Sequence, residues 1–460
     1  MESTTGTPLG TGDVYVNPNG NLSVAAPTSL SNSVTVFSDR AGLGGFGVQY
    51  DTTTLPGNVE YVTTGPFDGA LNLDSRFFSA ALDLSALGPN GRLFLGSAAD
   101  GIYAAPTLTA GTGNAYRLGA GGSTLNFQWY EGQLAGANDL HVGAVSNTTQ
   151  AASINLSNGG SITLDNRNPL LSGDVYLNNN TLTARVGGAL GTGDLIFNGG
   201  TLAQASQILI VRNDVRFLGD AGMTNDMTFT GNVDLLPATG AAGGATRIIN
   251  ANNNTAINGV VSGVDANIVK GGAGQLVLNG ANTFNGLVTV SNGTLVVTSD
   301  VRPNENGSLG NSFSALLLGD PGSGVNSPTL QLAGRLEFAR GITMVAGGTG
   351  LRTVRNQSLR RAQITGNIAV AQQSVFESQA GGRLEILGSI NGVNQTIQFG
   401  TLATTGANGQ VRLAAVINGY NISDYTGTTL INDARVIVAG KTLYTGPSDN
   451  PTILSGPFGA

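Results

Sequence analysis

Short runs that alternate apolar with polar residues, each ended by asparagine or glycine, recur along this chain and constrain its fold most. Examples are SVTVF at 33–37, GQLVL at 274–278 and LVTV at 287–290. Runs of this length and period, rich in β-branched residues, are typical of short β-strands. Apolar residues at helical spacing are almost missing. We therefore predict an all-β chain with tight corners, since asparagine and glycine both tolerate left-handed backbone conformations.

The composition argues for a repetitive architecture rather than for catalysis. Glycine supplies 70 of the 460 residues, and charged residues supply only 11%, less than half of the roughly 25% that is usual. Cysteine is absent, which excludes disulfides and cysteine-ligated zinc or iron–sulfur centres. A Ser-His-Asp triad would depend on His141, the single histidine. We predict no catalytic residue, no metal and no cofactor.

Two sequence units recur in the same order. The first reads LGTGD at 9–13 and again at 190–194. The second is a strand, an Asn/Gly corner and an apolar pair, and it occurs at 172–182, 285–295 and, more degenerate, 425–436. One such unit cannot bury its apolar face alone, whereas stacked units bury it continuously, so this pattern predicts a β-solenoid. At roughly 20 to 25 residues per coil, the chain would form about 20 coils.

One stretch resembles a specific family. It reads KGGAGQLVLNGANTFNG from Lys270 to Gly286 and runs on through LVTV and NGTL to Val297. This is similar to the autotransporter-associated β-strand repeat, or passenger-associated transport repeat, whose usual form is K-x-G-x-G-x-L-x-L-x-G-x-N-T-[YF]-x-G followed by T-x-V and N-x-G-T-L. Residues 425–438 look like a second copy without its first half, and 116–125 and 134–143 resemble phrases that recur in large proteins of this kind.

The resemblance implies a right-handed parallel β-helix that is displayed on a bacterial surface, in proteins that are typically adhesive or structural. The motif defines no catalytic residue, so none is carried over. We predict an all-β, right-handed parallel β-helix (β-solenoid) with irregular loop insertions, located outside the cell or at the bacterial cell surface. The chain has no series of alternating strands of about ten residues before its C-terminus, which puts self-translocation of this chain in doubt.

We expect four regions along the chain. They are opening solenoid coils at 1–36, irregular β-rich coils or an insertion at 37–150, a regular solenoid at 151–300 with the best repeat match at 270–297, and a solenoid with long loops at 301–460 that continues beyond the chain end.

Charge limits the partners. The net charge of −7 argues against nucleic acid, which needs clustered lysine and arginine. The densest basic segment contains Arg352, Arg355, Arg360 and Arg361, and it is either a solvated edge with local ion pairs or a contact for a glycan or other polyanion. No run of about 18 apolar residues is present, so we predict no membrane-spanning segment in this chain.

Few residues carry a specific chemical signal. Gly42–Gly47 fits G-x-G-x-x-G, but the residues that follow look extended, whereas a dinucleotide site needs a helix there. The acidic turns offer single carboxylates, too few oxygens for calcium. Trp129 and Tyr130 either fill a widened coil or form a platform on which sugars stack. We name Trp129, Tyr130, Arg352 and Arg355 as weak glycan-contact candidates.

The leading functional hypothesis is a non-enzymatic structural or adhesive rod outside the cell, which is either displayed on a bacterial surface or assembled head-to-tail into a fibre through its exposed solenoid ends. Glycans and cell-surface matrix are the expected partners. The alternative is a polysaccharide lyase or hydrolase, or a glycan-binding module, on the same fold, because fold alone does not decide function. Stacked Asp, Glu and Arg residues in one groove would favour the enzyme.

Overall fold

The structure is a computed structural model, and it describes most of the chain. The described residues are 9–28, 30–144, 159–205, 207–235, 244–400, 409–414, 416–417, 420–421, 423–439, 443–445 and 452–455. The predicted boundary at 150/151 and the chain end, where we predict continuation, lie outside these residues. The chain divides into two compact units, Met1–Gly231 and Asn232–Ala460, which are described separately. The four-region organisation stays a prediction.

The predicted parallel β-solenoid is confirmed. It contains about 16 turns, fewer than the 20 estimated from the sequence. Strands of successive coils pair in parallel, with side chains directly opposite one another. Val175 of one strand faces Leu195 of the next, and Leu195 faces Val215, so these coils are 20 residues long. Other coils are longer, as between Leu330 and Val354, because insertions lengthen the corners.

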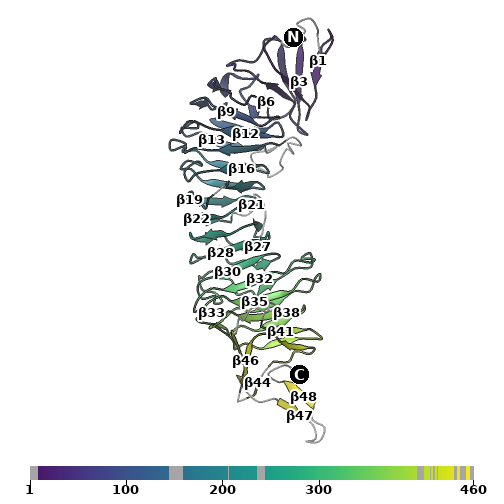
Figure 1. Ribbon diagram of the computed structural model, residues 1–460, viewed down its shortest axis with the longest axis vertical. Helices are drawn as coiled ribbons and strands as arrows, with labels where there is room; N and C mark the ends of the chain where they lie inside the picture. The colour runs from purple at the N-terminus through teal and green to yellow at the C-terminus, as the bar shows by residue number, and fades with distance from the viewer. Residues whose placement is uncertain are drawn as a thin grey trace. The chain divides into compact units, whose positions relative to one another are not determined.

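Two main sheets form the walls of the first unit, and the strands of one of them (β9, β12, β16 and β21 are labelled) follow one another along the unit in Figure 1. The first sheet contains β2 (Asn21–Val24), β4 (Gly45–Val48), β6 (Gly69–Leu73), β8 (Leu93–Gly96), β11 (Ala115–Ala120), β13 (Asp139–Val142), β15 (Val175–Asn178), β17 (Leu195–Asn198) and β20 (Val215–Phe217). The second contains β9 (Gly101–Tyr103), β12 (Thr124–Phe127), β14 (Ser161–Leu164), β16 (Thr181–Ala184), β18 (Thr201–Ala203) and β21 (Ala221–Thr224).

Shorter ladders complete the first unit. They are β1 (Val14–Val16) with β3 (Val34–Ser38) and β5 (Val59–Thr63), β7 (Leu82–Asp83) with β10 (Leu108–Thr109), and β19 (Leu209–Val211) with β22 (Met227–Phe229); one 3₁₀ turn, η1, spans Leu84–Ala86.

Three stacked sheets form the walls of the second unit. The first contains β24 (Thr246–Ala251), β27 (Asn267–Gly271), β29 (Val288–Val290), β31 (Leu316–Leu318), β34 (Ile342–Met344), β37 (Ile368–Val370) and β40 (Ile390–Gly392). The second contains β25 (Thr255–Ile257), β28 (Gln275–Leu278), β30 (Thr294–Val297), β32 (Thr329–Leu332), β35 (Arg352–Asn356), β38 (Ser374–Ser378), β41 (Ile397–Phe399) and β45 (Thr429–Ile431). The third contains β33 (Glu337–Phe338), β36 (Arg361–Ile364), β39 (Arg383–Ile386), β42 (Gln410–Leu413) and β46 (Arg435–Val438).

The remaining strands of the second unit are short. β23 (Val233–Asp234) pairs in parallel with β26 (Val261–Ser262), whereas β43 (Val416–Ile417) with β44 (Tyr420–Asn421) and β47 (Leu443–Thr445) with β48 (Thr452–Ser455) form antiparallel pairs.

The core follows directly from the alternating runs. In β15, for example, Val175 and Leu177 are fully buried, whereas Tyr176 between them is partly exposed. Because successive side chains of a strand point to opposite faces, each coil contributes an apolar row that stacks on the row of the next coil. Phe197 and Phe217 illustrate this contact, with their ring centroids 5.2 Å apart. Where a strand alternates in this way, the sequence therefore specifies which of its faces becomes core.

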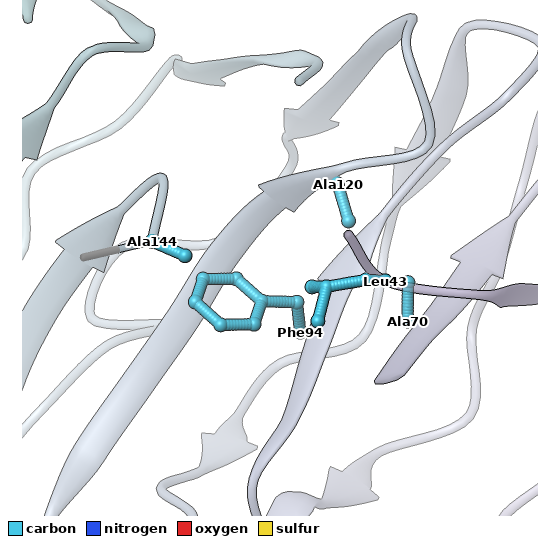
Figure 2. Close-up of a cluster of buried hydrophobic side chains, with 5 residues drawn as sticks. All are labelled: Leu43, Ala70, Phe94, Ala120 and Ala144. Carbon is cyan, nitrogen blue, oxygen red and sulfur yellow. The ribbon is translucent and has the colours of Figure 1, made fainter. Parts of the chain in front are cut away.

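The first unit also has a second, smaller apolar layer, shown in Figure 2. It consists of Leu43, Ala70, Phe94, Ala120 and Ala144, all buried. Phe94 lies between two buried core leucines of β8, so its ring points to the opposite face of that sheet. The three alanines leave room for the ring. This layer belongs to the part of the chain that is least repeat-like in sequence.

Candidate functional site

The two aromatic candidates are exposed. Trp129 and Tyr130 follow β12, and they are 67% and 46% exposed, so neither ring fills the solenoid coil. The backbone of Trp129 has a φ of 77°, a left-handed conformation that a bulky residue rarely adopts and that costs about 1–3 kcal/mol. An exposed aromatic pair on a strained corner can stack on the apolar face of a sugar. Their role as glycan contacts stays a prediction.

The two arginine candidates differ sharply from each other. Arg352, at the start of β35, is fully buried. Arg355 lies on the outer face of the same strand, is partly exposed and forms an ion pair with Glu377 of β38. Glycan contact by these two residues also stays a prediction, but only Arg355 is accessible from solvent.

The guanidinium of Arg352 holds corner backbone rather than a ligand. It donates to the carbonyl oxygens of Val345 at 3.1 Å, Gly347 at 2.8 Å and Gly350 at 3.1 Å, and also to that of Asn326 at 3.2 Å. Burial lowers the pKa of Arg352. The sequence contains no sign of this burial, because arginine at the start of a strand normally faces solvent.

The repeat stretch shows why its motif residues are needed. Lys270 of β27 is fully buried, and its Nζ donates to the carbonyl oxygens of Gly271 at 2.7 Å, Gly272 at 2.8 Å and Asn292 at 3.0 Å. The last of these belongs to the next coil. Burial lowers the pKa of Lys270 to about 8. The lysine therefore closes two consecutive corners with one cation.

Asn282 links three coils in the same stretch. Its side-chain oxygen accepts from the backbone N–H of Val261, 21 residues earlier, at 2.8 Å. Its side-chain nitrogen donates to the carbonyl of Ser308, 26 residues later, at 2.8 Å. Glycine is needed at positions 274 and 293 because the backbone of the preceding coil lies very close there. A Cβ on Gly274 would lie 2.2 Å from the carbonyl oxygen of Asn253, and a Cβ on Gly293 would lie 2.4 Å from that of Gly274. The motif thus encodes corner geometry and defines no reactive group.

A ladder of carboxylates in the first unit was not predicted. Four consecutive strands of one sheet, β13, β15, β17 and β20, each have an aspartate at or directly before their first residue. These aspartates are Asp139, Asp174, Asp194 and Asp214. The backbone N–H of Asp174 donates to Asp139 Oδ1 at 2.9 Å, and that of Asp194 donates to Asp174 Oδ1 at 2.9 Å. These two carboxylates therefore accept from the backbone of the following coil, which is a structural role. An aspartate that follows asparagine or glycine at the start of a strand recurs at all four positions, and this is the signal that could have revealed the ladder.

The ladder places like charges next to one another. Burial and the charge of Asp174 raise the pKa of Asp194, Arg216 opposes them, and Asp214 raises it further. Because the pKa in the folded chain exceeds that in the unfolded chain, the folded state binds the proton more readily. The free energy of unfolding therefore falls as pH rises through the window just above the ordinary aspartate pKa of 3.8.

We expect Asp194→Asn to stabilise the chain at neutral pH by less than about 1 kcal/mol, because it removes repulsion between stacked carboxylates. Urea unfolding followed by circular dichroism should give a higher midpoint than wild type at pH 7, and a smaller difference at low pH. Asp13→Asn, which removes an exposed charge outside the ladder, is the control. Equal effects of both variants would contradict a local origin.

His141 lies near the carboxylate ladder but is not a metal ligand candidate. Its ring stacks on Tyr176 with centroids 4.6 Å apart. Burial and the charge of Arg117 lower the pKa of His141 to about 4, so the imidazole is neutral at pH 7. The ring lines a small apolar cavity of about 100 Å³ beside Phe67 and Phe94. Within the part of the chain that the structure describes, no three His, Cys, Asp or Glu side chains gather to hold a metal ion.

A polar groove of about 350 Å³ lies at three stacked corners of the first unit. It is lined only by glycine and by short polar residues: Gly122, Ser123, Thr124, Gly159, Gly160, Ser161, Asn179, Asn180 and Thr181. Asn180 is held by donating to two backbone carbonyls, those of Gly119 and Gly160. Hydroxyl and amide groups of this kind suit hydrogen bonding to polyols, not proton abstraction.

Comparisons with known proteins agree with the repeat. The family described as Passenger-associated-transport-repeat matches residues 268–297. The Adhesin BmaC autotransporter of Brucella suis biovar 1 (strain 1330) is 28% identical over 176 residues. That match covers 38% of this chain and 5% of the relative, so the chain spans only a small part of the relative's length. No solved structure matches the chain.

The predicted resemblance to the passenger-associated transport repeat is therefore confirmed. The repeat and the relative indicate that the chain is located outside the cell or at the cell surface, as predicted. Among the described residues, no helix has the length and apolar character needed to cross a membrane.

Proposed function

We propose, on the basis of the passenger-associated transport repeat that this chain carries, that it is a non-enzymatic module of a surface-displayed protein and acts as an adhesive spacer. One observation carries the proposal: the motif residues Lys270 and Asn282 are used to close and link solenoid corners. A stretch whose motif residues hold stacked coils together lengthens the solenoid and presents its outer faces to solvent. The name of the relative, an adhesin, supports the adhesive part.

The enzyme alternative has weaker support. A hydrolase or lyase would need stacked charged side chains that are free to act on a substrate. In the carboxylate ladder, Asp139 and Asp174 accept backbone N–H groups of the following coil instead. The lining of the small cavity includes His141 and Arg117, but no carboxylate among the described residues, and the polar groove is lined by glycine, hydroxyl and amide groups.

An adhesion assay tests the proposal. Beads coated with the purified chain are washed over cultured cell monolayers, and retained beads are counted against beads coated with serum albumin. We expect several-fold more retention for the folded chain than for the chain denatured before coating. Equal retention of the folded and denatured coatings would contradict an adhesive role.

We also propose that the chain self-associates through solenoid ends. Each coil pairs through its backbone with the coil before it and the coil after it, as β15 does with β13 and β17, so the last coil of such a solenoid offers one edge of backbone donors and acceptors. Electron microscopy across a concentration series tests this proposal. Filaments that lengthen with concentration are expected, and single particles at every concentration would contradict it.

A glycan contact at Trp129 and Tyr130 is a second proposal, favoured by their exposure. We expect Trp129→Gly to abolish retention on a glycan array without loss of stability. Glycine adopts a positive φ without strain, so the midpoint of thermal unfolding should stay equal or rise by an amount that corresponds to about 1 kcal/mol. Tyr15→Gly, another exposed aromatic outside this corner, is the control. Unchanged glycan retention in Trp129→Gly would contradict the proposal.

A further inference from the structure

One sheet of the second unit carries arginines at matching positions of successive coils. Arg361 of β36 lies directly opposite Arg383 of β39, Arg383 opposite Gln410 of β42, and Gln410 opposite Arg435 of β46. The residues that follow them in β36, β39 and β42 are buried, so this column faces solvent. Strands of such a sheet lie ~4.8 Å apart, which sets the spacing of the column.

A second column runs beside the first, two residues further along each strand. Its members are Glu337 of β33, Gln363, Glu385 and Arg412. Glu385 is almost fully buried beneath the surface side chains and is paired with both Arg361 and Arg412. Burial alone would raise its pKa, but hydrogen bonds from Arg412 and Gln363 and the charge of both arginines lower it, so Glu385 is ionised. The buried carboxylate thus orients two arginines at the surface. We call the two columns together the arginine face.

The arginine face has an excess of positive charge. It contains four arginines and two glutamates, a local charge of +2 in a chain whose net charge is −7. Among the residues that the structure describes, Arg383 and Arg435 have no carboxylate within ion-pair distance. The ion pairs within the sheet therefore leave part of its positive charge without a neutralising carboxylate.

We propose that the arginine face binds a linear acidic polysaccharide that runs along the solenoid axis. A guanidinium presents planar, paired donors that match a carboxylate. Each of the strands β36, β39, β42 and β46 carries one arginine of the face, in one column or the other. The arginines therefore follow one another at the strand spacing of ~4.8 Å, on the scale of one sugar ring in an extended chain, so that a polyuronate offers about one carboxylate per coil. This binding site is separate from the aromatic corner and does not depend on the adhesive role proposed above.

Nucleic acid fits the arginine face less well. Duplex DNA carries one charge per ~1.7 Å of axis, several times denser than one guanidinium per strand. The chain as a whole also repels a dense polyanion, since its net charge is −7. A polymer with one carboxylate per sugar matches both the spacing and the modest local charge.

The test measures binding of the full chain to immobilised polygalacturonate by biolayer interferometry, with neutral dextran and a single-stranded oligonucleotide as comparison probes. The variant is Arg383→Glu with Arg435→Glu. The control is Arg167→Glu with Arg212→Glu, two exposed arginines of the first unit. Both double variants lower the net charge by the same amount, from −7 to −11.

We expect the arginine-face variant to bind polygalacturonate roughly tenfold more weakly, and the control variant to bind within about twofold of wild type. Wild-type binding should weaken as salt increases, since exposed charges are screened. If the variant with glutamate at both positions fails to fold, the milder double variant Arg383→Gln with Arg435→Gln is measured in its place. Equal losses in both double variants, no binding of polygalacturonate, or tighter binding of the oligonucleotide would each overturn the proposal.

Discussion

Replacing Lys270 with methionine should lower the free energy of unfolding by about 3 kcal/mol, because three backbone carbonyl oxygens around a buried side chain lose their donor. Methionine keeps most of the side-chain volume, so cavity formation contributes little. Removal of a buried charge offsets part of the loss. The three unsatisfied acceptors outweigh this gain, since each costs about 1–3 kcal/mol. Urea unfolding at pH 7, followed by circular dichroism, measures the effect.

The same lysine gives wild type a characteristic pH dependence. The pKa of Lys270 is lowered from 10.5 to about 8 in the folded chain, so the unfolded chain binds the proton more tightly. Stability of wild type relative to Lys270→Met should therefore rise between pH 8 and 10.5, and stay constant below pH 7. Taking the difference between the two proteins removes the effect of tyrosine titration. A flat difference across this window would contradict a buried cationic lysine.

The second large effect is expected at Arg352. Arg352→Met should cost about 3–4 kcal/mol, because four backbone carbonyls at stacked corners lose a charged donor in a site without solvent access. The corner segments 319–328 and 345–350 should then become more sensitive to protease. The guanidinium joins Asn326 of the first to Val345, Gly347 and Gly350 of the second, and the backbone bonds from Thr349 and Gly350 to Gly324 would have to hold the two corners without it. Limited proteolysis with mass spectrometry identifies the cut sites.

Two further variants separate this role from general charge loss. Gly319→Ala should reproduce the protease sensitivity, because a Cβ there would lie 2.2 Å from Arg352 Nε and displace the guanidinium. Arg360→Met, at an exposed position nearby, should change stability by less than about 0.5 kcal/mol. Protection of both corners from protease in Arg352→Met would show that other contacts hold them.

Local pattern was enough to predict the type of fold. The alternation in SVTVF and GQLVL, with its Asn and Gly punctuation, predicts strands and corners from neighbouring residues only. Val34 and Val36 of β3, and Leu276 and Leu278 of β28, form the buried rows that this alternation predicts. The close match at 270–297 likewise identified the repeat, because its spacing is encoded within one stretch of chain. None of these conclusions depends on how many residues are inserted at the corners between strands.

The sites depend on how one coil aligns with the next, and local pattern does not specify that alignment. Asp174 and Asp194 are 20 residues apart, whereas Asp139 and Asp174 are 35 apart, yet all three occupy equivalent rungs of one ladder. The arginine face is similar, since Arg361 and Arg383 are 22 residues apart and Gln410 and Arg435 are 25 apart.

The sequence by itself therefore determined the strands, the corners and the repeat of this protein, because these follow from contacts between near neighbours. Only the tertiary structure decided which charged side chains share a face and which are buried, as Arg352 and Arg355 show within a single strand. The physical reason is that insertions of variable length lie in the corners. Parallel hydrogen bonding between strands then restores the register, and this register brings distant residues together.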